Sequence, residues 1–175
     1  MPGLVTAKTS ALCLAAILGT VILASGQSKL GAAPGTMIEV GGHTLHINCS
    51  GPHEAKPVVI FEAGGGAFSK DWTVAQSLLA RQVSSCAYDR AGLGWSGPGP
   101  APRTLKQEVF ELHTLLKVAQ ISGPLVLVGQ SIGALNVRLY TMEYGNEVAG
   151  IVLVDPADEK QHGVQCDRRS LDQIT

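Results

Sequence analysis

Residues 125–133, Leu-Val-Leu-Val-Gly-Gln-Ser-Ile-Gly, decide the fold of this chain. The first four form a continuous apolar run too short for a helix, which predicts a buried strand of a parallel sheet. Gly129, Ser131 and Gly133 match Gly-x-Ser-x-Gly, a pattern in which a strained strand-to-helix turn lifts a serine above the sheet. Apolar residues at helical spacing predict a helix from Ser131 to about Tyr144. This setting favours Ser131 as an activated nucleophile over the alternative, an ordinary strand-to-helix turn.

Further strands are predicted on both sides of this stretch. Continuous apolar runs at 58–61 and 151–154 have the length and composition of buried parallel strands. Residues 85–88 give a weaker signal, which depends mainly on the turn residues that follow them. Residues 38–47 contain two short alternating runs around a glycine pair, as in a β-hairpin.

Helical patterns lie between these strands. Apolar spacing predicts one helix near 72–79 and another near 105–116. Thr104 precedes the second helix as its N-cap, and Gln107 three residues later would complete a capping box. Strands that alternate with helices specify an α/β fold, a mostly parallel twisted sheet with helices on both faces.

The composition indicates one globular domain and excludes several classes of function. The chain has 175 residues, of which 45% are hydrophobic and 15% charged. Its formal net charge is -1 and it has no long run of Lys or Arg, so it lacks the clustered cations that bind nucleic acid. We expect a small-molecule ligand and predict no nucleic-acid partner, no cofactor and no metal ion.

The first 26 residues have the pattern of an export signal. Lys8 precedes an apolar stretch at 11–24, and Ala24 with Gly26 forms a small-x-small cleavage pattern. We predict a signal peptide over 1–26 and a secreted or periplasmic protein. The alternative is an uncleaved signal anchor, the one case in which a membrane would be a partner. A linker rich in Gly, Ala, Ser and Pro is expected at 27–36, with the domain at 37–175.

A second glycine-rich segment follows the predicted strand at 58–61. Residues 62–67 read Glu-Ala-Gly-Gly-Gly-Ala, and consecutive glycines let backbone N–H groups approach a developing oxyanion. In enzymes with a nucleophile elbow, this loop supplies one donor and the residue after the nucleophile supplies the other. We expect an oxyanion hole from Gly65, with Gly66 as the next choice, and Ile132. A flexible loop whose glycines only relieve crowding is the alternative.

Residues 88–96, Tyr-Asp-Arg-Ala-Gly-Leu-Gly-Trp-Ser, resemble the Asp-x-x-Gly-x-Gly-x-Ser turn of the α/β-hydrolase family. The glycine loop and the serine motif occur in the family's order, and the similarity runs from about residue 39 to 156. Gln130 stands where many relatives carry histidine, a position that is not the catalytic base. The resemblance implies the first part of an α/β-hydrolase fold and hydrolysis of an ester, thioester or amide bond through an acyl-enzyme.

A dinucleotide-binding loop is the rival interpretation of this segment. Gly92, Gly94 and Gly97 match Gly-x-Gly-x-x-Gly, which must open a helix onto a pyrophosphate. The proline-rich residues 98–102 follow at once, so no such helix can begin there.

The resemblance also locates the rest of a catalytic triad. In this family the acid and the histidine follow the serine. Of the five histidines only His162 follows Ser131, and it lies in a polar stretch where the family would begin its lid. Asp155, after the predicted strand at 151–154, is a candidate acid. We therefore expect a fragment that lacks the catalytic histidine and is inactive alone. The alternative is a non-catalytic remnant or binding module on the same fold.

The resemblance and the export signal together imply a disulfide. In the family's sheet the second strand lies antiparallel to the fourth, which makes Cys49 and Cys86 neighbours. An exported protein folds in an oxidising compartment. A bond between these two cysteines is therefore expected, with Cys166 unpaired.

Overall fold

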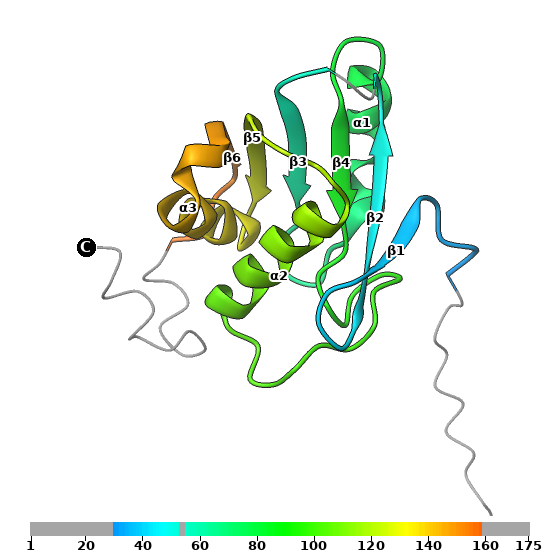
Figure 1. Cartoon of the computed structure of the whole chain (residues 1–175), viewed down its shortest axis with the longest axis vertical. Helices are drawn as coiled ribbons and strands as arrows, with labels where there is room; N and C mark the ends of the chain where they lie inside the picture. The colour runs from blue at the N-terminus through cyan, green and yellow to red at the C-terminus, as the bar shows by residue number, and fades with distance from the viewer. Residues whose placement is uncertain (1–29, 53–54, 159–175) are drawn as a thin grey trace, which may run out of the picture.

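The apolar runs form one six-stranded sheet with helices packed on it, which confirms the predicted fold class (Figure 1). The structure is a computed structural model and describes residues 30–52 and 55–158. The predicted signal segment and His162 lie outside these residues. The strands are β1 (Thr36–Glu39), β2 (Thr44–Ser50), β3 (Val58–Glu62), β4 (Ser85–Tyr88), β5 (Leu125–Gln130) and β6 (Val148–Val154).

The sheet is mixed and has the strand order β1-β2-β4-β3-β5-β6. β1, β2 and β4 pair antiparallel in succession, whereas β4, β3, β5 and β6 are parallel. The carboxyl ends of β3, β4 and β5 therefore meet at one edge of the sheet, where α/β proteins bind ligands. β6 begins at Val148, three residues before the predicted run. The sequence did not predict this start because Ala149 and Gly150 interrupt the run of large apolar residues.

The helices follow the predicted spacing, with a difference at the start of α3. They are η1 (Ser69–Trp72), α1 (Thr73–Leu79), α2 (Leu105–Val118), α3 (Gly133–Glu143) and η2 (Gly145–Glu147). α3 starts two residues later than predicted, because Ser131 and Ile132 form the turn itself. No helix of the described residues is long and apolar enough to cross a membrane.

The cap of α2 forms only in part. The Thr104 hydroxyl accepts a hydrogen bond from the Gln107 backbone N–H at 3.2 Å, as an N-cap should. The Gln107 side chain does not return to Thr104 but donates to Glu111 Oε1 at 3.0 Å. The predicted capping box is therefore wrong in its second half, since a capping box needs the Gln107 Oε1 to accept from the Thr104 N–H, whereas the side-chain amide is held at Glu111 through its Nε2.

The main core lies between the sheet and helices α2 and α3, which Figure 1 shows on the same side of the sheet. Leu112, Leu115, Leu127 and Tyr140 are fully buried there. A smaller cluster is centred on Phe61, and α1 packs against it on the other face.

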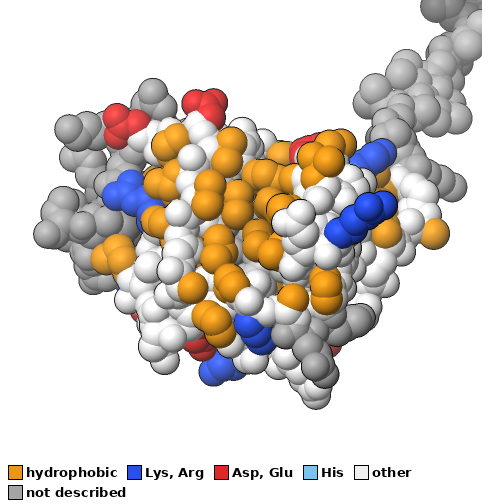
Figure 2. Space-filling view, turned by 90° about the horizontal axis from the view of Figure 1, so that it is seen from above, with side chains coloured by type: hydrophobic (Ala, Val, Ile, Leu, Met, Phe, Trp, Pro, Cys, Tyr) orange, Lys and Arg blue, Asp and Glu red, His pale blue; other side chains and the backbone are white. Residues whose placement is uncertain are grey.

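Apolar side chains also remain at the surface. In a view from above Figure 1, hydrophobic side chains gather over the middle of the molecule, with several Lys and Arg nearer the rim (Figure 2). Among the large hydrophobic residues that are exposed, four are consecutive in β6: Ile151, Val152, Leu153 and Val154.

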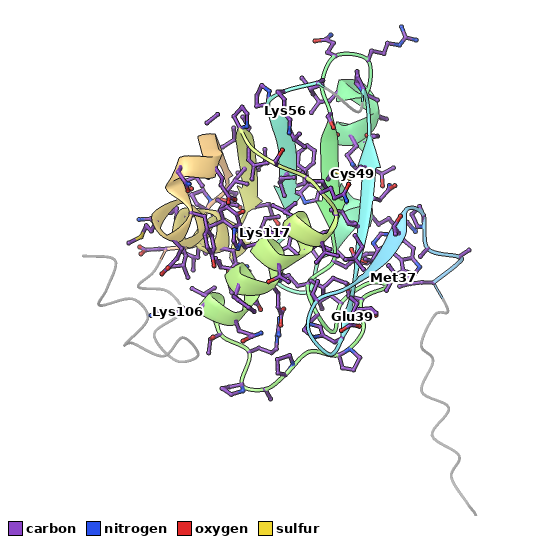
Figure 3. The ribbon with its side chains drawn as sticks, viewed as in Figure 1. Met37, Glu39, Cys49, Lys56, Lys106 and Lys117 are labelled. Atoms are coloured by element: carbon purple, nitrogen blue, oxygen red, sulfur yellow. A yellow bond between two sulfur atoms is a disulfide. The ribbon has the colours of Figure 1, made fainter. Side chains whose placement is uncertain are left out.

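A disulfide joins the second and fourth strands. Cys49 and Cys86 are direct partners in the register of β2 and β4, their Cα atoms lie 4.0 Å apart, and their sulfur atoms are bonded. Cys49 lies on β2 and is the last residue but one of that strand (Figure 3). The bond fastens the antiparallel part of the sheet to the parallel part.

Candidate active site

Ser131 occupies a strained turn between β5 and α3. Its φ is 52°, a left-handed conformation that is uncommon for a residue other than glycine. A methyl group at Gly129 would lie 2.5 Å from the backbone oxygen of Gly133, and one at Gly133 would lie 2.6 Å from that of Ala63. Both neighbours of the turn must therefore be glycine. The motif has the geometry of a nucleophile elbow.

The main chain of Ser131 is fixed to the end of β6. Its N–H donates to the Val154 carbonyl at 3.1 Å, and its carbonyl accepts from the N–H of Ala157 at 3.1 Å. Asp155 lies between these two contacts, with a positive φ of 43° and an exposed side chain. The candidate acid is thus held close to the serine by the backbone, although its side chain does not line the cleft above Ser131.

That cleft has a volume of about 520 Å³. The glycine loop forms one wall, and a methyl group at Gly64 would lie 2.2 Å from Gln130 Oε1. A methyl group at Gly65 would lie 3.9 Å from Cγ2 of Ile132. The two predicted oxyanion donors therefore belong to neighbouring residues beside the serine.

Trp72 forms another wall of the cleft. Its ring stacks on Phe61, with centroids 4.7 Å apart, and its indole Nε1 is buried without a hydrogen-bond partner in the described part of the chain. A buried donor left unpaired carries a desolvation cost of about 1–3 kcal/mol, which a bound ligand or water would relieve. Among the described residues, Asp71 is the one ionisable residue that lines the cleft.

A buried polar network lies directly beneath the glycine loop. Arg90 donates to the Glu62 carboxylate and to the backbone oxygens of Ala63 and Gly64. The Tyr88 hydroxyl also donates to Glu62, and Asn136 of α3 lies 3.4 Å from the same carboxylate. Burial raises the pKa of Glu62, and the Arg90 guanidinium opposes that rise.

Asp89 organises the turn that contains the family motif. Its carboxylate accepts hydrogen bonds from the backbone N–H groups of Ser69 at 2.7 Å and Trp95 at 2.9 Å. Burial opposes ionisation, but these bonds and one from His46 lower the pKa of Asp89 below its ordinary value. A methyl group at Gly94 would lie 2.2 Å from Asp89 Oδ2, so this position must be glycine. The segment 92–97 is a turn and α2 begins at Leu105, which confirms that no dinucleotide-binding helix opens here.

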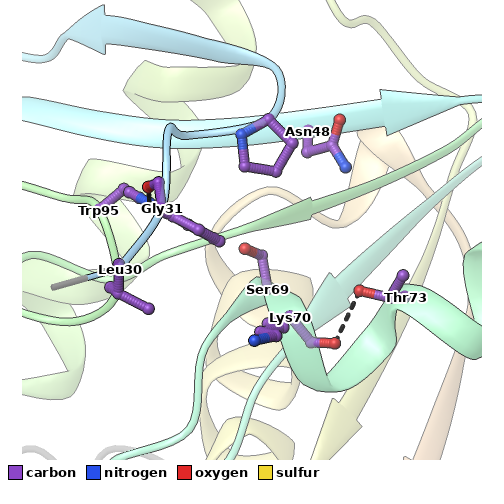
Figure 4. Close-up of a pocket in the computed structure, with 8 residues that line it drawn as sticks. Leu30, Gly31, Asn48, Ser69, Lys70, Thr73 and Trp95 are labelled. Atoms are coloured by element: carbon purple, nitrogen blue, oxygen red, sulfur yellow. Dashed lines mark hydrogen bonds between the residues drawn. The ribbon is translucent and has the colours of Figure 1, made fainter. Parts of the chain in front are cut away.

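Ser69, His46 and Asp89 have the residue types of a catalytic triad but not its geometry. His46 Nδ1 lies 3.0 Å from Asp89 Oδ2 and 3.4 Å from the Ser69 hydroxyl, so both partners share one ring nitrogen. The other nitrogen, Nε2, contacts the Pro34 carbonyl. A triad requires the acid and the serine on opposite nitrogens of the histidine. Ser69 therefore has no base, although it lines a second cleft of about 460 Å³ with Lys70 and Trp95 (Figure 4).

Two other histidines are described, and neither reaches Ser131. His43 lies 3.3 Å from Glu111, and His113 lies 3.2 Å from Glu147 while its ring stacks on Tyr144. No histidine of residues 30–52 or 55–158 lines the cleft above Ser131. The described residues bring together the nucleophile and the two expected oxyanion donors, but not a base.

The sequence did not predict Arg90, Glu62 or Asn136 as part of this site. A charged residue at the end of an apolar strand, as Glu62 is, and an arginine inside the family turn were the available signals. These signals become informative only when β3 and β4 are known to be adjacent in the sheet, because that pairing brings Arg90 next to Glu62.

Together, the parallel sheet, the strained serine at its carboxyl edge and the glycine loop beside it define an α/β architecture of the hydrolase type. The chain belongs to the α/β-hydrolase fold family, whose pattern it matches over residues 56–172. The protein YqjL of Bacillus subtilis is 38% identical over 115 residues, which are 66% of this chain and 44% of YqjL.

Solved structures share the same fold. A hydrolase from Pseudomonas aeruginosa superposes with a TM-score of 0.64 at 21% identity, over 69% of this chain and 45% of that one. An enol-lactonase from Burkholderia xenovorans superposes with a TM-score of 0.62 at 20% identity, over 66% and 45%. The chain thus spans less than half the length of these relatives.

Proposed function

We propose that the protein is a serine hydrolase in which Ser131 cleaves an ester, thioester or amide bond. The observation that carries the proposal is the φ of 52° at Ser131, between two glycines that cannot carry a side chain. Strain of this kind persists where the surrounding structure enforces it, which is typical of functional sites. Here it presents the hydroxyl to a cleft instead of the core.

The reaction follows from the groups around the serine. Ser131 Oγ attacks the acyl carbon while a base takes its proton, and the carbonyl oxygen becomes an oxyanion. The N–H groups of Gly65 and Ile132 stabilise that oxyanion. Collapse expels the leaving group, which takes the proton back, and water then releases the acyl group as an acid.

The base and the acid of this mechanism remain proposals. Because no described histidine lines the cleft, the base comes from outside the described residues. Asp155 is proposed as one candidate for the acid, since the backbone holds it beside Ser131. A chain in which no histidine reaches Ser131 should show little turnover, since loss of the triad histidine removes most of the acceleration.

Covalent labelling tests the nucleophile. A fluorophosphonate probe should label the protein, Ser131→Ala should abolish labelling, and Ser69→Ala should leave it unchanged as a matched control from the second cleft. Labelling that survives in Ser131→Ala would refute the assignment.

Hydrolysis of a short-chain nitrophenyl ester by the 175-residue chain and by His162→Ala tests the base. Robust turnover lost in that variant would show that the chain supplies its own histidine.

A non-catalytic binding module is the second candidate, favoured by the absence of a base from the described cleft. It predicts that an acyl ligand binds in the cleft and is released unchanged, equally well in Ser131→Ala. Turnover by the protein would exclude it.

We also propose that the protein is exported. The Cys49–Cys86 bond supports this, because disulfides persist in oxidising compartments. Sequencing of the mature N-terminus tests the proposal: a start at Gln27 indicates a cleaved signal peptide, and a start at Met1 or Pro2 indicates an anchor or no export.

A further inference from the structure

The two oxyanion donors come from different elements of the fold. Gly65 lies in the loop after β3, and Ile132 lies at the start of α3, 67 residues later in the chain. An oxyanion hole works only when both N–H groups point at one position within a few tenths of an ångström. Something must therefore hold the loop and the helix in a fixed relation.

Arg90 holds the loop. Its Nη2 donates to the backbone oxygen of Gly64, and its Nη1 donates to that of Ala63. The Gly64 oxygen and the Gly65 N–H belong to one planar peptide unit and point in opposite directions when the bond is trans. A guanidinium that binds the oxygen from below therefore turns the Gly65 N–H upward, away from Arg90. It also polarises that peptide, which strengthens the N–H as a donor.

The same network reaches the helix. Glu62, which accepts from Arg90, lies 3.4 Å from Asn136 Nδ2. Asn136 is one turn along α3, and its backbone N–H bonds to the Ile132 oxygen at 3.4 Å. The Asn136 amide also donates to Glu108 of α2 at 2.9 Å. The loop and the first turn of α3 thus share one buried carboxylate.

Burial makes this arrangement rigid and specific in geometry. Glu62, Arg90 and Asn136 are at most 6% exposed. A buried ion pair adds little stability compared with apolar residues of the same volume, but it requires one geometry. Arginine suits this role because its planar fork presents several donors at once, which a lysine ammonium cannot match.

We propose that Arg90 is a positioning residue of the hydrolase: it orients the Gly64–Gly65 peptide and, through Glu62 and Asn136, aligns the loop donor with that of Ile132. The proposal rests on the proposed function. Arg90 touches no substrate and acts through the peptide that it binds.

The test replaces Arg90 by lysine in the protein. Misplacement of a catalytic group by about 1 Å costs on the order of 100-fold in rate, so kcat for a nitrophenyl ester should fall about 10- to 100-fold, with KM changed by less than about threefold. The amide 15N resonance of Gly65 should shift, because the Gly64 oxygen loses the guanidinium donor, although the Ala67 N–H still donates to it at 3.2 Å.

Arg103→Lys is the matched control. Arg103 forms a two-point ion pair with Glu111, both contacts at 2.6 Å, and touches neither the loop nor Ser131. It should lower the melting temperature without lowering kcat or moving the Gly65 resonance. Tyr88→Phe, which removes only the hydroxyl donor to Glu62, serves if Arg90→Lys does not fold, and kcat should then fall about fivefold.

Equal losses of kcat in Arg90→Lys and Arg103→Lys at equal loss of stability would show a merely structural role and overturn the proposal. A loss confined to KM, or an unchanged Gly65 resonance, would also overturn it. If the unmodified protein hydrolyses no ester, or Ser131→Ala retains activity, the proposed function fails, and the Gly65 resonance alone then decides whether Arg90 orients the peptide.

Discussion

The two edges of the sheet are built differently. β1 is a strand of four residues, Thr-Met-Ile-Glu, with a charged side chain at its end, whereas β6 has seven residues, Val-Ala-Gly-Ile-Val-Leu-Val, and no charge. Protein sheets protect a free edge with short strands and charged residues, and a continuous apolar run is typical of a strand inside a parallel sheet. β1 thus has the composition of an edge, and β6 that of an interior strand.

Ser131, the proposed nucleophile, lies near the β6 edge. Ser131 follows β5 and bonds to the end of β6, while the disulfide fastens the β1 side of the sheet. The disulfide therefore cross-links one side of the sheet, whereas the side that carries the proposed nucleophile has exposed apolar side chains in β6. Four changes, taken from the largest expected effect to the smallest, test this difference.

Removing the disulfide should have the largest effect on stability. The bond closes a loop with a sequence separation of 37, for which loop-closure entropy predicts about 4 kcal/mol. The double variant Cys49→Ala, Cys86→Ala should lose that free energy of unfolding in urea titrations. Hydrogen exchange should accelerate most in β1 and β2, and a loss spread evenly over the sheet would contradict the idea that the bond secures this side.

A pair of leucines compares the interior with the β6 edge directly. Leu127 of β5 is 0% exposed, whereas Leu153 of β6 is 39% exposed. Leu127→Ala should cost about 2–5 kcal/mol, since it leaves a cavity in the core. Leu153→Ala should cost less than about 1 kcal/mol, in proportion to the smaller area buried. Thermal denaturation of both variants measures the difference, and equal losses would mean that β6 is covered in solution.

The His46–Asp89 pair makes the β1 side sensitive to pH. Burial disfavours the imidazolium, but hydrogen bonds to Asp89 and Pro34 raise the pKa of His46 above its ordinary value. The contribution of protonated His46 to stability is complete below the pKa that His46 has in the unfolded chain. It declines as the pH rises through the higher pKa of His46 in the folded protein. The pKa of Asp89 is lowered, so its contribution to stability is complete above the pKa that Asp89 has in the unfolded chain. That contribution declines as the pH falls through the pKa of Asp89 in the folded protein.

His46→Gln should therefore flatten the loss of stability on the alkaline side of neutrality. The expected change is about 1 kcal/mol, the usual net contribution of one hydrogen bond. Melting temperatures measured from pH 5 to pH 9 check it. If the variant kept the alkaline slope of the parent protein, His46 would not be its source.

Local signals explain how much of this structure the sequence could predict. The glycines around Ser131, the Thr104 cap and the apolar runs act within a few residues, and each produced the expected element. Arg90 differs, because its acceptors are 26 to 28 residues away and are neighbours only through the register of β3 and β4. The Gln107 side chain donates to Glu111, four residues later in α2, so two local partners were available and the spacing alone did not distinguish them.

A lysine introduced into the β6 edge should have the smallest effect on folding stability of the four changes, but it should weaken self-association. Val152 is 48% exposed in the middle of β6, and Met37 is 41% exposed on β1 (Figure 3). Surface substitutions of this kind change the free energy of unfolding by about 0.5 kcal/mol or less, so Val152→Lys and Met37→Lys should melt close to the parent protein. An inward or edge lysine, however, disfavours pairing of a strand with another chain.

The two lysines should therefore differ in self-association. If the unprotected β6 edge drives self-association, Val152→Lys should weaken it about tenfold in sedimentation equilibrium, a change of about 1.4 kcal/mol, because each interface would bury an ammonium. Met37→Lys should leave association unchanged, since β1 already has the length and charge of a protected edge. Equal weakening by both lysines would mean that association reflects general charge, and that the contrast between the two edges has no consequence in solution.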